Sequence, residues 1–188
     1  QGTITGSVTV NSGGTYSPGS TIGTQSVGSL NVNSGGAVTI QIDGNAAGSY
    51  DKIVSTGAIT LNGGTLTGSS SFSGSSGFKP TLGSKFTVAS GSSVTGKFAN
   101  YNFSSNPAGT TFMPEYTNGQ VNLFAVPANY GLDIPQLNGN QKLLGSTLQS
   151  FRPTEIDNRT TLSDSGKIFN GLIRLDENQL RQAFDQLT

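Results

Sequence analysis

A short phrase that recurs three times in the first third of the chain restricts its fold more than any other feature. GSVTVNSGG at residues 6–14, GSLNVNSGG at 28–36 and GAITLNGGT at 57–65 share one order of residue types. In each copy the apolar positions alternate at period two, as in a half-buried strand. The Asn and Gly residues that follow accept the positive φ angles of a tight turn. Each copy therefore predicts a strand followed by a turn.

The spacing of the copies predicts how these strands assemble. The repeated asparagines Asn11, Asn33 and Asn62 are separated by 22 and 29 residues, which is typical of a repeat architecture. A unit this short cannot bury its apolar face alone, so successive units must stack. We expect a mainly β fold, a right-handed parallel β-helix with a C-terminal α-helical segment, with an inner apolar ladder and outer polar ladders of Ser, Thr and Asn. A globular β-sandwich is the alternative, because its turns recur at a similar spacing.

The composition changes near residue 126. Residues 1–125 carry seven of the 20 charged side chains and 22 of the 27 glycines, and all four arginines follow residue 150. We therefore expect two regions, 1–126 and 127–188, joined near 125–135, where two prolines discourage regular pairing. Within the first region the repeat loosens after about residue 70 and aromatic residues become frequent. Residues from about 70 to 126 are predicted to form a cap that closes the open end of the core.

The second region carries three amphipathic segments that predict helices. They lie within 138–151, 164–175 and 176–187, and Asp176 with Gln179 forms a predicted capping box at the start of the third. The side chains expected to pack are Leu144, Leu148, Phe169, Leu172, Leu180, Phe184 and Leu187.

Composition excludes several classes of function. The formal net charge is zero and only 11% of residues are charged, so a nucleic-acid partner is not expected. The chain has no Cys and no His, which removes thiolate chemistry, imidazole bases and most zinc sites. A sugar-cleaving β-helix enzyme would need paired carboxylates. Asp43, Asp51 and Lys52 are the only charges in the first 78 residues and Glu115 stands alone, so we expect structural roles for them and no enzyme, cofactor or metal.

Several phrases, in order, resemble the C-terminal passenger region of monomeric autotransporters, the type V secreted proteins of Gram-negative bacteria. Residues 10–45 resemble the autotransporter-associated β-helix repeat, with its Ser-Pro-Gly and Ile-Gly-Thr elements, and SYDKIVSTGAITLNGGTL at 49–66 resembles the segment that follows it. KFTVASGSSVTGKF and MPEYTNGQVNLFAV resemble the closing rungs, called the junction or autochaperone region. LNGNQKLLGSTLQ and AFDQLT resemble the helical linker before the translocator barrel.

This resemblance implies a non-catalytic scaffold that is exported through the periplasm and displayed on the outer membrane or secreted after cleavage. It implies that the chain is a piece of a longer protein, with its own translocator β-barrel and further passenger rungs as partners, and that it emerges C-terminus first. A stable C-terminal unit could then template the remaining rungs. The expected folding nucleus is Phe86, Val88, Phe98, Tyr116, Val121 and Leu123; alternatively these residues only fill the core of the cap. The other function class is a virulence-associated adhesin that binds host glycan or matrix through the solenoid face.

Overall fold

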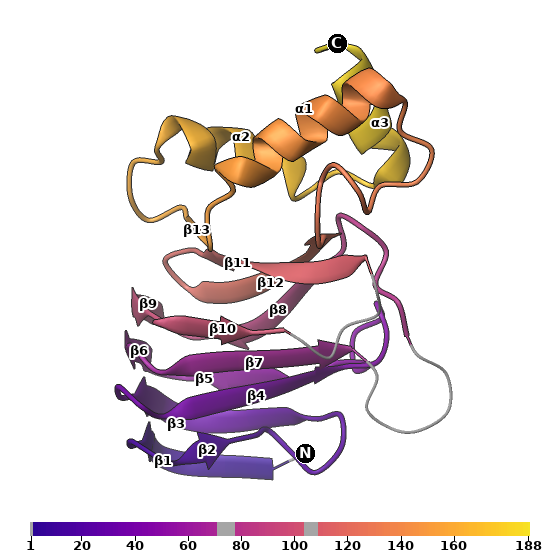
Figure 1. Cartoon of the computed structure of the whole chain (residues 1–188). Coiled ribbons are helices and arrows are strands. Elements are labelled where there is room, and N and C mark those ends of the chain that lie inside the picture. Colours follow the sequence, from indigo (N-terminus) through magenta and orange to yellow (C-terminus); the bar gives the residue numbers. More distant parts are fainter. Residues whose placement is uncertain (1, 71–77, 104–108) are drawn as a thin grey trace.

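The computed structural model describes residues 2–70, 78–103 and 109–188. Residues 71–77 and 104–108 of the predicted cap lie outside the described part. Strands lie in layers, one above the other, and three short helices cover the end of this stack at which the chain finishes (Figure 1).

Thirteen strands and three helices follow one another along the described chain. The strands of the repeats are β1 (Gly2–Val10), β2 (Thr15–Tyr16), β3 (Thr24–Val32), β4 (Ala37–Ile42), β5 (Lys52–Ser55), β6 (Ala58–Asn62) and β7 (Thr65–Ser70). The later elements are β8 (Lys85–Ser90), β9 (Ser93–Lys97), β10 (Asn100–Asn102), β11 (Thr110–Tyr116), β12 (Gln120–Pro127), α1 (Gly139–Ser150), β13 (Ile156–Asp157), α2 (Asp164–Leu172) and α3 (Glu177–Asp185).

The three copies of the repeated phrase lie above one another in parallel register. Their apolar side chains form two columns, Val8, Leu30 and Ile59 in one and Val10, Val32 and Leu61 in the other. Outside them, the Asn33 side-chain amide donates to Asn11 Oδ1 at 2.9 Å, and that of Asn62 donates to Asn33 Oδ1 at 3.3 Å. The predicted stacking of the copies and the polar ladder are thus confirmed.

Two glycines of the phrase, Gly36 and Gly64, are required by this close stacking. A Cβ atom on Gly36 would lie 2.7 Å from the carbonyl oxygen of Val10, and one on Gly64 would lie 2.6 Å from that of Gly36. Gly64 also has a φ of +81°, which L side chains rarely adopt. Any side chain at these turns would force neighbouring layers apart.

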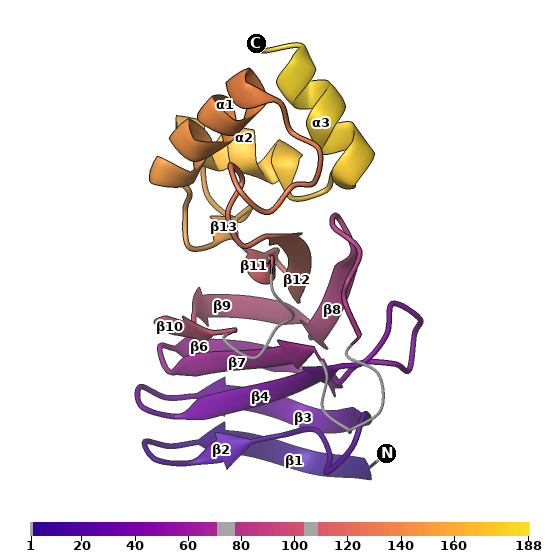
Figure 2. The same ribbon diagram turned by 45° about the vertical axis from the view of Figure 1, so that its right-hand side comes forward.

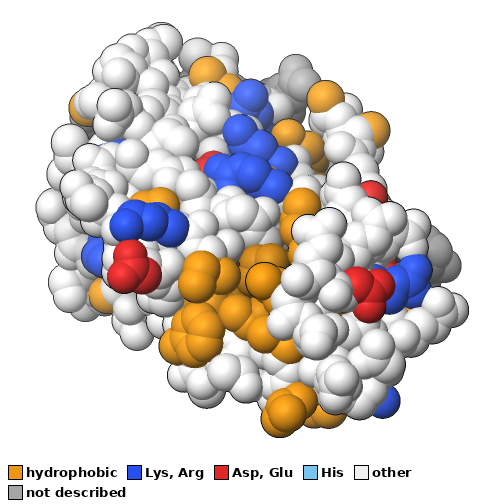
Figure 3. Space-filling model, turned by 90° about the horizontal axis from the view of Figure 1, so that it is seen from above, with side chains coloured by type: hydrophobic (Ala, Val, Ile, Leu, Met, Phe, Trp, Pro, Cys, Tyr) orange, Lys and Arg blue, Asp and Glu red, His pale blue; other side chains and the backbone are white. Residues whose placement is uncertain are grey.

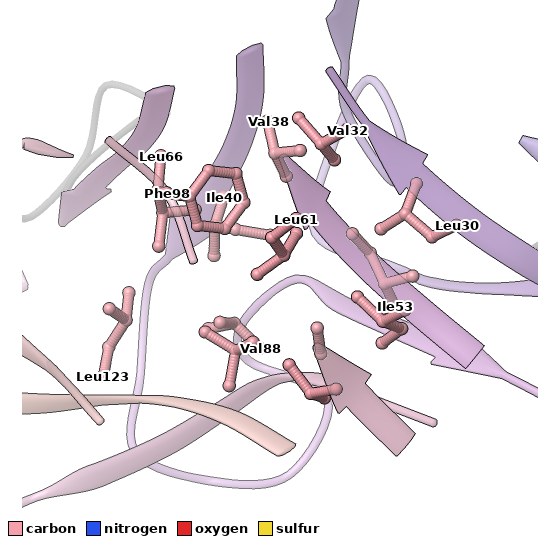
Figure 4. Packing of buried hydrophobic residues seen from close by; sticks show 14 of the residues in the cluster. Leu30, Val32, Val38, Ile40, Ile53, Leu61, Leu66, Val88, Phe98 and Leu123 are labelled. Carbon is pink, nitrogen blue, oxygen red and sulfur yellow. The ribbon is translucent and has the colours of Figure 1, made fainter. Parts of the chain in front are cut away.

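Two sheets face each other across the core. The larger has the order β13-β11-β12-β8-β5-β3-β6-β9, with β1 also paired to β3, and the smaller has the order β10-β7-β4-β2. Figure 4 shows side chains of both sheets pointing toward one another, with Val38, Ile40 and Leu66 opposite Leu30, Leu61 and Val88. The first core cluster consists of Val10, Val27, Leu30, Val32, Val38, Ile40, Ile42, Ile53, Ile59, Leu61, Leu66, Phe86, Val88, Ala89, Val94, Phe98, Phe112, Tyr116, Val121, Leu123 and Ala125.

The prediction of a regular right-handed parallel β-helix is wrong. The larger sheet is mixed, because β12 pairs antiparallel with both β11 and β8, and it curls into a half-barrel. The physical reason is the sequence Thr117-Asn118-Gly119-Gln120, in which the Thr117 amide donates to the Gln120 carbonyl at 3.0 Å and the chain reverses. Asn-Gly between two apolar runs is a strong hairpin signal. It competes with the stacking pattern here and outweighs it.

The helical layer covers the hairpin (Figure 2). Hydrophobic side chains gather on part of the surface at this end (Figure 3), and others form an apolar interior of the layer. The second core cluster consists of Met113, Phe124, Val126, Tyr130, Ile134, Leu137, Leu148, Ile156, Phe169, Ile173, Leu180 and Phe184. Strand β12 serves both clusters, because its alternate residues face opposite ways. The division of the chain at residue 126 stays a prediction.

The helices agree closely with the sequence. The capping box of Asp176 and Gln179 is present at α3, and a second one, Asn138 with Gln141, begins α1. Of the predicted packing residues, Leu148, Phe169, Leu180 and Phe184 are buried in the second core cluster, and Leu144 and Leu172 pack against it. Leu187 is 70% exposed, because α3 ends at Asp185 and the chain leaves the layer, so its predicted packing is not seen.

Candidate functional site

The six residues predicted as the folding nucleus lie together. Phe86 and Val88 are on β8, Phe98 follows β9, Tyr116 is on β11, and Val121 and Leu123 are on β12. All six are at most 5% exposed and belong to the first core cluster, at the end that the hairpin closes. We call β8, β11, β12 and the residues from Ser93 to Asn102 the antiparallel cap. Burial in one cluster is what both a nucleus and a simple cap core require, so the nucleation role stays a prediction.

Aromatic rings connect the cap to the layers below it. Phe86 meets Tyr50 and Phe112 edge to face, with ring centroids 5.3 and 5.8 Å apart. Phe112 also meets Phe103 at 5.7 Å, and Phe103 stacks on Tyr101 at 6.1 Å. Each such pair adds about 0.5–1.5 kcal/mol to the burial of the rings. Phe112 was missing from the predicted nucleus, although it stands at a buried position of an alternating strand.

The Tyr116 hydroxyl is part of a buried hydrogen-bond network. It accepts from the Phe98 amide at 3.2 Å and lies 2.9 Å from the Tyr101 hydroxyl, which donates to the Phe98 carbonyl at 3.3 Å. The Arg159 guanidinium lies 5.0 Å from the centre of the Tyr116 ring. Burial raises the pKa of Tyr116 to about 12, so the phenol is neutral at physiological pH. The network fixes the chain after β9 against β11.

Glu115 is the centre of a second network, which we call the polar junction. Its carboxylate is 2% exposed and accepts from the side-chain amides of Asn122 at 2.9 Å and Asn158 at 2.8 Å. It also forms an ion pair with Arg174, which follows α2 and lies over the Phe124 ring. Asn122 Oδ1 in turn accepts from the Thr87 hydroxyl at 2.8 Å. Glu115 has no acidic neighbour in the sequence, and these three partners, two of them more than 40 residues away, were not predicted.

Arg159 and Lys97 tie β13 and the residues beside it to the cap. Arg159 pairs with Asp157 through Nε–Oδ1 and Nη2–Oδ2 contacts of 2.7 and 2.8 Å, and its Nη1 donates to the carbonyls of Val94 and Gly96. Lys97 pairs with Glu155 at 2.7 Å. Hydrogen bonds from Arg159 lower the pKa of Asp157. Burial raises the pKa of Glu155, but the bonds from Lys97 and Thr154 outweigh it, so the net shift is downward.

Asp51, one of the acidic residues considered for catalysis, has a structural role. It is fully buried, and its two carboxylate oxygens accept the backbone amides of Gly23 and Gln41, each at 2.9 Å. Burial raises the pKa of Asp51 against the lowering effect of these two bonds. The carboxylate thereby holds the loops before β3 and β5 to β4. The described partners of Asp51 and Glu115 are different residues, and each carboxylate has a structural role.

Nothing in the described part of the chain adds a metal centre or a membrane span. Those residues contain no cluster of three or more acidic side chains placed to hold an ion. Nor is any helix in residues 2–70, 78–103 or 109–188 long and apolar enough to span a membrane. No known family model matches the chain, and no curated protein does.

Proposed function

We propose that the chain is a non-catalytic scaffold of an exported bacterial surface protein of the autotransporter type, and that its antiparallel cap acts as the folding platform. The observation that carries the proposal is the arrangement of the cap. Its hairpin pairs with β8, and the polar junction joins it to the helical layer. On the side of the parallel layers, β8 pairs with β5 and β9 pairs with β6.

The physical argument rests on which contacts are local. A hairpin such as β11 and β12 closes a short loop, whereas each parallel pair joins residues 22 or more positions apart and costs more loop entropy before it is formed. In a preformed cap, β8 and β9 are available as edges on which β5 and β6 can add. Strand β3 can then add to β5 and β6, and β1 to β3. A chain that emerges C-terminus first, as the resemblance implies, would then fold in this order.

A display experiment tests the proposal. The chain is placed between a protease-reporter passenger and an autotransporter barrel, and residues 80–126 are deleted. We expect the passenger to be exported but protease-sensitive, with resistance restored when the same segment is supplied in trans. The matched control deletes residues 2–22, which contain β1 and β2 but no part of the cap. Normal protease resistance after deletion of residues 80–126 would overturn the proposal.

The second candidate, an adhesin, is favoured by the low charge and the outward Ser, Thr and Asn side chains of the parallel layers. Glycan-array binding by the whole chain, lost when outward side chains of β3 and β4 are changed to Lys, would support it. This readout does not depend on folding order, so the two functions can be separated.

A further inference from the structure

A groove of about 470 Å³ lies between the edge of the smaller sheet and the end of α1 with the loop that follows it. One wall comprises Asn100, Tyr101 and Phe103, and the other comprises Gln149, Arg152 and Thr154. The walls come from segments about 50 residues apart in the chain, so no local sequence pattern indicates this groove. Its lining combines aromatic rings, amides and one cation, so it offers a ligand both apolar and polar contacts.

Arg152 differs from the other three arginines. Arg159, Arg174 and Arg181 each pair with a carboxylate, whereas no described carboxylate pairs with Arg152. Its Nη1 donates to the carbonyls of Pro127 and Ala128 at 3.1 and 3.2 Å, and its guanidinium lies 5.8 Å from the centre of the Tyr130 ring. Burial lowers its pKa. A half-buried guanidinium without a counter-charge is stabilised by an anion that enters the site.

The acidic residue closest to Arg152 in the sequence, Glu155, does not fill this role. Glu155 is engaged by Lys97 at 2.7 Å and by the Thr154 hydroxyl at 2.6 Å. Its charge is thus largely balanced, and the positive charge of Arg152 remains available to a ligand.

The opposite wall includes β10. β10 is the last strand of the smaller sheet and pairs only with β7 among the described strands. The Asn100 amide donates toward β7, to the Gly64 carbonyl at 3.1 Å, so the backbone groups of the next residue, Tyr101, point to the other side. The outer side of an edge strand is a template on which another strand can add.

We propose that this groove binds an extended peptide segment with an acidic side chain, which adds to β10 as a further strand and places its carboxylate on Arg152. The strand edge favours a peptide over an acidic oligosaccharide, because only a peptide can continue the backbone ladder. Side chains of the peptide that alternate with the acidic one lie against Tyr101 and Phe103.

The test uses the whole chain and a fluorescein-labelled peptide in which Thr and Val alternate on both sides of one central Glu. The peptide has roughly eight residues, which is within the usual range of strand lengths. We expect binding in fluorescence anisotropy, weakened about tenfold when Glu is replaced by Gln, which corresponds to one charged hydrogen-bond pair. Arg152→Gln should abolish this preference for Glu. Lys142→Gln, which removes an exposed positive charge of α1 outside the groove, should leave binding unchanged.

A second measurement separates strand addition from simple charge attraction and needs no protein variant. The same Glu peptide, N-methylated at alternate peptide bonds, should bind at least about tenfold more weakly, since it cannot complete a ladder. Equal binding of the Glu and Gln peptides, or of the N-methylated and unmodified peptides, would overturn the proposal. So would binding of oligogalacturonate at Arg152 without binding of the peptide.

Discussion

The parallel layers and the antiparallel cap both bury apolar side chains, but different contacts hold each of them together. The layers β1 to β7 contain almost no charge, and identical or similar residues stack on their own copies. The cap and the helical layer are held by aromatic pairs, two buried polar networks and Arg-carboxylate contacts between segments far apart in the sequence. Because the parallel layers resemble one another, each presents similar contacts to its neighbours, whereas each contact of the cap is specific to one partner. The contrast predicts that the cap determines global stability and that the layers fray from the β1 end.

The largest expected effect comes from the cap core. Phe86→Ala removes a fully buried ring with two aromatic partners and should lower the free energy of unfolding by about 3–5 kcal/mol. Val8→Ala, in the partly buried end layer, is the matched control and should cost about 1 kcal/mol. Urea denaturation followed by circular dichroism measures both. Equal losses would contradict the view that the cap dominates.

The polar junction should give the next largest effect. Glu115→Gln keeps the shape but removes the ion pair with Arg174, and should cost about 1.5–3 kcal/mol, less than for a fully buried pair because Arg174 is 40% exposed. Lys167→Gln breaks the exposed pair with Asp164 and should change stability by less than about 0.5 kcal/mol.

A double-mutant cycle of Glu115→Gln with Arg174→Gln isolates the pair itself. A coupling energy near zero would show that the junction does not hold the helical layer to the cap through this contact.

The same contrast explains which features could be predicted from the sequence. The stacked copies follow from the recurrence of Val8, Leu30 and Ile59, because a parallel ladder places equal positions together. The Asp176 capping box is equally local. The partners of Glu115 could not be predicted, because Asn158 and Arg174 meet it only after the hairpin and α2 have docked. The hairpin was predictable from Asn118-Gly119, but the repeat pattern led us to expect another parallel layer.

Acid should weaken the contacts of the β13 segment before it affects the layers. The folded-state pKa values of Asp157 and Glu155 are lowered by Arg159 and Lys97, so these carboxylates stabilise the fold above their unfolded pKa values of about 4. Their contribution is lost as the pH falls through the lower folded values. Asp51 has the opposite shift, so its protonation in the same range does not destabilise the layers in this way.

Amide hydrogen exchange of the whole chain at decreasing pH, corrected for intrinsic rates, measures this order. Protection should fall first around β13 and β9. An Asp157→Asn variant should lose part of this pH dependence, and a variant with unchanged dependence would argue that other carboxylates are responsible.

The smallest expected effect concerns the asparagine ladder. Asn33 is its middle member and bonds both Asn11 and Asn62, but the side chains are exposed to water, so Asn33→Ala should cost no more than about 1 kcal/mol. Asn31→Ala, two residues earlier at the end of β3 and outside the ladder, is the matched control and should cost less. Native-state hydrogen exchange shows which strands lose stability in the Asn33→Ala variant. Because each layer touches only its neighbours, faster exchange should be confined to β1, β3 and β6. Faster exchange in β11 and β12 as well would mean that the layers and the cap unfold as one unit, and the cap could not then serve as a platform that forms before the layers.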